Sequence, residues 1–95
     1  MNERPEIAFI TNPTSHHVDV ALKAAKAGCH LFIEKPIDSC IDRVEELVEL
    51  VASKGLITTV AYQLRFHPGL NQAFHWLQEK RIGNLLSVSI RQGEY

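Results

Sequence analysis

Short apolar runs alternate with helical stripes along this chain. Residues Ile7 to Thr11 form an almost continuous apolar run, which is typical of a strand buried on both faces of a parallel sheet, and Asn12-Pro13 closes it. From Ser15 to Ala27 the apolar residues recur at helical spacing, and Gly28 follows directly. These two patterns predict a strand followed by a helix.

The same alternation continues through the middle of the chain. Leu31 to Ile33 predicts a second strand, which runs into Glu34-Lys35-Pro36. A second helix is expected to begin at a capping box formed by Ser39 and Asp42 and to end at Lys54-Gly55. Its predicted apolar face consists of Ile41, Val44, Leu47, Val48 and Val51.

The last part of the chain adds a strand, a helix and a run of a different kind. Leu56 to Ala61 is rich in β-branched residues and predicts a third strand. Apolar residues between Leu70 and Leu77 predict a third helix, with Phe74 in the core and Trp76 as a packing or interface residue. Leu85 to Ile90 alternates apolar and polar residues, which indicates a half-exposed strand.

Strands that alternate with helices over short connections indicate right-handed crossovers, and therefore an α/β fold with a parallel sheet covered by helices on both faces. The half-exposed last strand does not fit that pattern, so we assign it to an antiparallel sheet of an α+β second domain. This assignment places a domain boundary near Ile82-Gly83-Asn84. Residues 1–83 would then form one domain, and residues 84–95 would begin another.

Composition and charge narrow the class of protein. The 95 residues are 45% hydrophobic and 22% charged, as in ordinary globular proteins. The net charge of -1, without a basic stripe, makes nucleic acid and membrane surfaces unexpected partners. The chain shows no secretory leader and no apolar run of about 20 residues, so we expect a cytoplasmic protein with Cys29 and Cys40 reduced. We expect no metal site, because His16, His17 and His30 lack carboxylates or thiols at ligand spacing.

Ligands bind beyond the carboxyl ends of the strands in open parallel sheets. Three segments follow the predicted strands: Thr11 to Ser15, Glu34 to Asp38 and Tyr62 to His67. A lysine at such an edge, like Lys35, can stabilise negative charge that develops on a substrate oxygen, although a solvated lysine at a strand end is the simpler alternative.

Four segments together resemble the Gfo/Idh/MocA oxidoreductases in order and spacing, over nearly the whole chain. They are ITNPTSHH, VALKAAKAGCHLFIEKPI, YQLRFHP and RIGNLLSVSI. The resemblance implies a Rossmann-type dinucleotide-binding domain, of which residues 1–83 would be the C-terminal half, and an α/β second domain with an open antiparallel sheet, which residues 84–95 would begin. It also implies NAD or NADP as cofactor and a sugar, nucleotide sugar or related polyol as substrate.

The resemblance further implies roles for individual residues. Lys35 would be catalytic and in contact with both substrate and cofactor, and Glu34 would be cofactor-facing. From the residues alone, Lys35 is expected to be partly buried because it follows a buried strand, and Glu34 could simply be its ion-pair partner. Pro36 would follow a cis peptide bond, and His17, the family histidine, would contact the Glu-Lys-Pro loop. The implied cofactor-binding set is Thr11, Asn12, Pro13, His17, Glu34, Lys35 and Pro36, although Thr11 to Pro13 could simply end a strand.

The segment QLRFHP is similar to the version found in members that act on nucleotide sugars or other polysaccharide precursors. In this segment Arg65 would bind an anionic or hydroxyl-rich substrate, or else pair with a nearby acid. The substrate class therefore stays open between sugars, nucleotide sugars and polyols.

The chain lacks several parts that the family pattern contains. It has no glycine-rich G-x-G-x-x-G turn, no acidic residue for a ribose hydroxyl and little of the second domain, where the family keeps its proton-transfer residues. We therefore expect a partial member with weak or absent cofactor binding by itself. The alternative is a non-catalytic truncated fragment. Because the Ile7 to Thr11 strand would be a bare edge, we expect a homo-oligomer.

Overall fold

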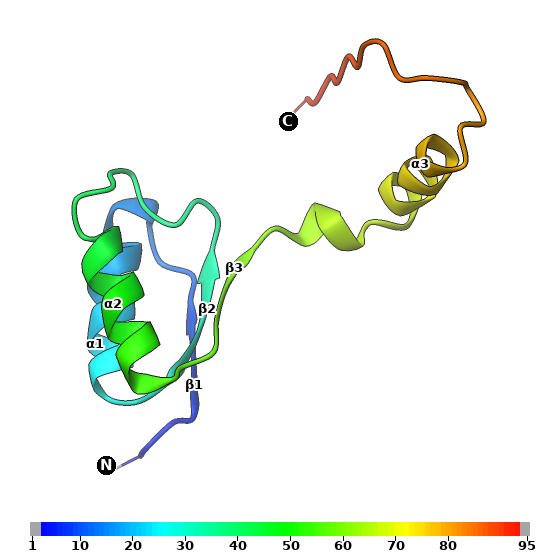
Figure 1. Cartoon of the computed structure of the whole chain (residues 1–95). Helices are drawn as coiled ribbons and strands as arrows, with labels where there is room; N and C mark the ends of the chain where they lie inside the picture. The colour runs from blue at the N-terminus through cyan, green and yellow to red at the C-terminus, as the bar shows by residue number, and fades with distance from the viewer. Residues whose placement is uncertain (1–2, 94–95) are drawn as a thin grey trace. The chain divides into compact units, whose positions relative to one another are not determined.

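The structure is a computed structural model, and it describes residues 3–93. The chain divides into two compact units, residues 1–62 and residues 63–95. The described part of the first unit contains three strands and two α-helices in strict alternation (Figure 1): β1 (Ile7–Ile10), α1 (His17–Lys26), β2 (His30–Glu34), α2 (Val44–Lys54) and β3 (Thr58–Ala61). A short 3-10 turn, η1 (Thr14–His16), leads into α1.

The sheet of the first unit is parallel, with strand order β1-β2-β3. Ile10 lies beside Ile33, and Ile33 lies beside Val60, so the three strands end at the same edge. The first three predicted strands and their alternation with helices are therefore confirmed. Because each crossover is an α-helix between neighbouring parallel strands, the carboxyl-end turns gather at one edge of this unit.

One hydrophobic core holds the first unit together. The helix α1 buries the stripe that its sequence predicted, Val18, Ala21, Leu22 and Ala25. These side chains pack in one cluster with Ile10, Leu31, Ile33 and Leu47 from the sheet and α2. Burying a Leu or Ile side chain contributes about 1.5 to 3 kcal/mol, so this cluster is the main source of stability for the unit.

The prediction that helices cover both faces of the sheet is wrong for the described part of the first unit. The helices α1 and α2 pack against each other on the same face of the sheet (Figure 1). Successive right-handed crossovers that move in one direction across a sheet place their helices on the same side, which explains the arrangement. On the other face Phe9 is 69% exposed, and its ring lies 5.3 Å from that of Phe32.

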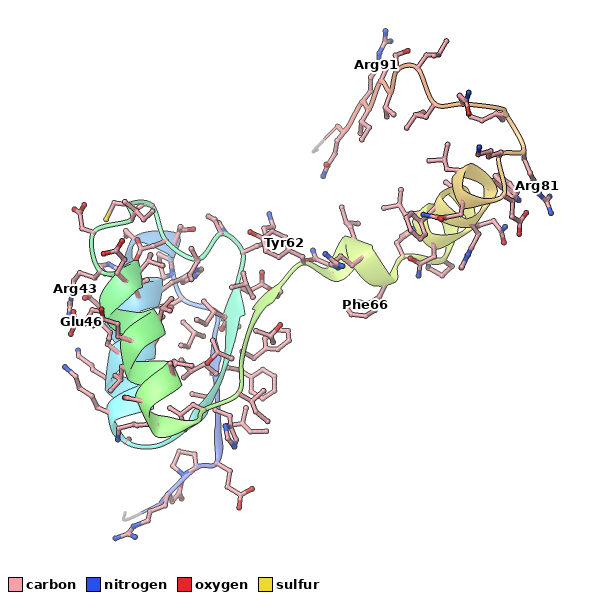
Figure 2. All side chains as sticks on the ribbon, viewed as in Figure 1. Arg43, Glu46, Tyr62, Phe66, Arg81 and Arg91 are labelled. Carbon is pink, nitrogen blue, oxygen red and sulfur yellow. The ribbon has the colours of Figure 1, made fainter. Side chains whose placement is uncertain are left out.

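The start of α2 also differs from the prediction. The capping box of Ser39 and Asp42 is absent: the N-cap is Arg43 without a side-chain hydrogen bond, and the Ser39 hydroxyl donates to Asp38 instead. The predicted end at Lys54-Gly55 is confirmed, with Gly55 in the left-handed conformation at φ 62. Figure 2 labels Arg43 and Glu46, whose side chains form an ion pair at 2.9 Å.

The second unit contains the 3-10 turn η2 (Gln63–Phe66) and the helix α3 (Pro68–Gln78). The α3 prediction is confirmed: His67 accepts a hydrogen bond from the Gly69 N–H as N-cap, and Pro68 occupies the first turn. Phe74, which was expected in the core, is 56% exposed and lines an open hollow with Leu64 and Arg65 of η2. A helix that forms its unit with one short turn has little to bury its stripe against.

The predicted strand over Leu85 to Ile90 does not form; these residues have no regular secondary structure. A strand is stabilised by hydrogen bonds to a neighbouring strand, and the described part of the second unit contains no strand to supply them. No helix in residues 3–93 is long and apolar enough to cross a membrane.

Candidate functional site

The turns after β1 and β2 come together at the carboxyl edge of the sheet in the first unit. Ile10 and Ile33 are the paired residues at which the two strands approach this edge, and Tyr62 follows β3 (Figure 2). The Glu34-Lys35-Pro36 turn therefore begins at the end of the central strand. This is the position at which open parallel sheets present ligand-binding residues.

The carboxylate of Glu34 is held by the backbone. Its Oε2 accepts a hydrogen bond from the Lys35 N–H at 3.0 Å. Among residues 3–93 no ion pair joins the Glu34 carboxylate to the Lys35 ammonium, so the ion-pair alternative for Glu34 does not describe this structure. Lys35 is exposed, so the partial burial expected from its place after a buried strand is wrong. The Lys35–Pro36 peptide bond is cis, as the resemblance implied.

His17 joins the two turns. Its ring is 2% exposed and lies at the first residue of α1. Nδ1 is 2.8 Å from the carbonyl oxygen of Pro36, and Nε2 is 2.7 Å from the carbonyl oxygen of Asn12. The ring thus contacts the Glu-Lys-Pro loop, and both of its polar atoms face backbone oxygens.

The turn after β1 contains a buried polar side-chain atom without a partner in the described residues. The Asn12 side-chain oxygen is buried and has no hydrogen-bond partner within the described residues, whereas Thr11 and Pro13 are exposed. A buried carbonyl oxygen without a donor is costly, at about 1 to 3 kcal/mol, unless a ligand or water supplies the hydrogen. Asn12 can therefore accept from an amide or hydroxyl group placed at this edge.

Asp38 is a residue of this region that sequence reasoning missed. Its Oδ2 accepts from the Val18 N–H at 3.2 Å and its Oδ1 accepts from the Ser39 N–H at 2.6 Å. Desolvation opposes ionisation of the carboxyl group, but the hydrogen bonds from Ser39 and Val18 outweigh it and lower the pKa of Asp38. The carboxylate thus fastens the loop after Pro36 to the first turn of α1, and no spacing in the sequence signalled it.

Arg65 belongs to the second unit, where it is exposed in η2. It lines a shallow hollow of about 300 Å³ together with Leu64, Leu70, Asn71 and Phe74. No acidic side chain within the described residues forms an ion pair with Arg65, so its guanidinium can accept an anionic or hydroxyl-rich ligand. Within residues 3–93 no group of three or more His, Cys, Asp or Glu side chains could hold a metal ion.

Residues 1–62, which are the whole first unit, match the family model of the oxidoreductases with an NAD-binding Rossmann fold, Gfo/Idh/MocA. The chain belongs to this family. The matched range contains all seven of the expected cofactor-binding residues and leaves Arg65 outside. The partial Rossmann-like sheet is therefore the family's fold.

Relatives with curated names support the same family. The chain is 32% identical over 78 residues to the scyllo-inositol 2-dehydrogenase (NAD(+)) of Bacillus subtilis, which covers 82% of this chain and 23% of that protein. It is 31% identical over 81 residues to the levoglucosan dehydrogenase of Pseudarthrobacter phenanthrenivorans, covering 85% of this chain and 21% of that protein. The chain thus spans about a fifth to a quarter of these relatives.

A solved structure agrees in fold. The scyllo-inositol dehydrogenase from Lactobacillus casei, with bound NAD(H) and scyllo-inositol, matches with a TM-score of 0.74 at 28% identity. The match covers 83% of this chain and 24% of that one. Family membership and a shared fold therefore rest on sequence and structure alike.

Proposed function

We propose that this chain is a segment of an NAD(P)-dependent dehydrogenase that acts on a sugar, nucleotide sugar or related polyol, in the cytoplasm. The observation that carries the proposal is the exposed Lys35 ammonium at the carboxyl end of the central strand, in a unit that matches an NAD-binding family. The names of the relatives, which include inositol and levoglucosan dehydrogenases, support a polyol or sugar substrate.

In this proposal the bound nicotinamide, of NAD or NADP, supplies hydride transfer to or from a substrate carbon. Lys35 contacts the substrate oxygen and stabilises the negative charge that develops there. Glu34, anchored to the Lys35 N–H, faces the cofactor together with Pro36, while Thr11, Asn12 and Pro13 contact the dinucleotide. The Asn12 side-chain oxygen, without a donor in the described residues, fits a carboxamide or hydroxyl hydrogen.

Two further parts of the proposal concern the second unit. Arg65 would bind the substrate through the hollow that it lines. Residues 84–95 would begin the α/β second domain, and residues 1–83 would form the C-terminal half of the dinucleotide-binding domain. The remaining parts of both domains, including the proton-transfer group, would come from protein outside these 95 residues.

A domain-exchange experiment tests the proposal. The segment of the Bacillus subtilis scyllo-inositol 2-dehydrogenase that matches this chain over 78 residues is replaced by the matching residues of this chain. We expect the exchanged protein to reduce NAD with a polyol or sugar, because its site would again contain Lys35 and the turn after β1. Nicotinamide absorbance measures the rate. A folded exchanged protein that binds NADH but turns over none of a panel of sugars, nucleotide sugars and polyols contradicts the proposal.

If that exchange disrupts folding, the same segment is placed in the inositol 2-dehydrogenase of Rhizobium meliloti, which is 32% identical over 85 residues. Circular dichroism and thermal unfolding establish that each recipient is folded before its activity is compared. Loss of activity in one recipient alone would indicate a poor fit where the exchanged segment joins that protein. Loss of activity in both folded recipients would indicate a failure of the site.

A second candidate function is a non-catalytic fragment that self-associates. The exposed Phe9 and Ile7 on the edge strand β1 favour it, because apolar edges pair readily with other strands. For the 95-residue chain by itself we expect a dimer or larger homo-oligomer in light scattering and weak or no saturation with NADH. Phe9→Lys, which places a charge on the edge strand, is expected to shift the mass towards the monomer.

Ile41→Lys is the matched control, because Ile41 is also well exposed but lies in the loop before α2 and not on a strand. It is expected to leave the mass unchanged. A monomeric wild-type chain at high concentration, or an equal response to both lysine variants, argues against association through β1.

A further inference from the structure

His17 is the one polar or charged side chain that is fully buried in the described residues. Its two ring nitrogens lie 2.8 Å from the Pro36 carbonyl oxygen and 2.7 Å from the Asn12 carbonyl oxygen. These oxygens belong to the turns that follow β2 and β1, while the ring itself begins α1. One side chain therefore connects three segments that meet at the candidate site.

The chemistry of the two partners decides the protonation state of the ring. A carbonyl oxygen accepts hydrogen bonds and cannot donate, and a neutral imidazole carries one N–H and one lone pair. A neutral His17 would therefore leave one lone pair facing a carbonyl oxygen inside the protein. Both contacts are hydrogen bonds only when both nitrogens carry a proton.

The helix end and the nearby carboxylates act on a positively charged ring in opposite directions. The N-terminus of a helix disfavours a cation, which counts against an imidazolium at the first residue of α1. Two carboxylates act in the opposite direction: Asp38 accepts the Val18 N–H, and Asp19 lies in the first turn of α1. Asp19 also contacts Arg43, so Asp38 is the carboxylate with the more direct effect on this helix end.

We propose that His17 is a positioning residue, an imidazolium that donates Nδ1–H to Pro36 and Nε2–H to Asn12 and so holds the Lys35 turn against the turn after β1. The ring has no polar atom left for a dinucleotide, so it acts through its neighbours. We call this connection of the two turns by His17 the brace. Its effect on catalysis rests on the proposed function of Lys35, whereas the brace itself does not.

Nitrogen NMR of the 95-residue chain tests the protonation state directly. With labelled histidine, both ring nitrogens of His17 are expected to show attached protons at neutral pH. Because the ring is buried, these protons should exchange slowly with solvent, unlike those of the exposed His16, His67 and His75. A His17 ring with one unprotonated nitrogen overturns the proposal, and this result requires no variant that could fail to fold.

Amide hydrogen exchange then tests the bracing role. His17→Leu removes both donors and fills the buried position with an apolar side chain. His16→Leu is the matched control at the neighbouring exposed position. In His17→Leu we expect exchange at the Val18 and Lys35 amides to rise by about tenfold or more, which is the size expected from losing hydrogen bonds of a charged donor. The Leu31 amide, bonded to the Ile57 carbonyl oxygen in the sheet, reports global opening and should change less.

Equal exchange at Val18 and Lys35 in the two leucine variants overturns the brace, as does a rise at Leu31 of the same size. Kinetics in the exchanged dehydrogenase separate this proposal from the proposed function. There, His17→Leu should lower kcat more than it raises KM, because a misplaced Lys35 loses contact with the transition state first. The two proposals can also fail separately. If the ring is doubly protonated and exchange rises only locally, but Lys35→Ala retains normal turnover, the bracing role stands and the proposed function is rejected.

Discussion

Replacing Lys35 by alanine in the exchanged dehydrogenase is expected to lower kcat/KM by about 10²- to 10³-fold. This is the typical loss when one group that stabilises a developing oxyanion is removed. Lys35 follows the end of the central strand, its side chain is exposed, and the neighbouring Glu34 carboxylate is engaged by the Lys35 backbone N–H. The ammonium is therefore available to a substrate oxygen. Steady-state assays over a range of substrate and cofactor concentrations measure the effect.

The matched control is Lys23→Ala, which removes an exposed lysine from α1. It should leave kcat/KM within about twofold of the unmodified exchanged protein, because an exposed surface charge contributes little. A loss confined to KM for the cofactor in Lys35→Ala would indicate a binding role without transition-state stabilisation. Near-normal turnover in Lys35→Ala would reject the catalytic role altogether.

Residues that end helices, together with strong periodicity, predicted much of the first unit. Gly28 and Gly55 mark helix ends, since both have positive φ values that glycine adopts without strain. The α1 stripe from Val18 to Ala25 matches the buried face because every one of its positions packs against the sheet or α2. Strong periodicity and special backbone positions are encoded locally, so the sequence contains them.

Interactions that depend on distant partners were the ones that sequence reasoning missed. Phe9 and Phe74 are apolar and were expected to be covered, but apolarity does not record which element lies over a side chain. The capping box failed because Asp38 takes up the Ser39 hydroxyl and backbone N–H, and the helix begins only after Arg43. Competition between nearby hydrogen-bond partners is decided by three-dimensional distances.

In the candidate site, too, some features could be predicted from the sequence and others depended on distant partners. The strand-end position of Lys35 followed from the pattern, and its family role followed from the resemblance. The contact of His17 with Pro36 also followed from the resemblance, but its second contact, with the Asn12 carbonyl, did not. Backbone carbonyl acceptors carry no residue-type signal, because every residue has one. A brace made from backbone oxygens is therefore invisible in sequence until the fold is known.

The apolar residues of α2 differ in burial in a way that the sequence pattern did not predict. The pattern assigned Leu47 and Val48 to one apolar face, but the structure separates them: Leu47 is 2% exposed and belongs to the core cluster, whereas Val48 is 59% exposed. Leu47→Ala is expected to lower the free energy of unfolding by about 2 to 5 kcal/mol, through lost burial and the cavity that remains in the core cluster.

Val48→Ala is the matched control on the same helix and is expected to change the free energy of unfolding by less than about 0.5 kcal/mol. Urea unfolding of the 95-residue chain, followed by far-ultraviolet circular dichroism, measures both values. Because so small a chain has a modest core, a Leu47→Ala variant without a folded baseline would agree with the expected loss. Equal losses in the two variants would mean that α2 is not packed through Leu47, and the one-sided arrangement of α1 and α2 on the sheet would then be wrong.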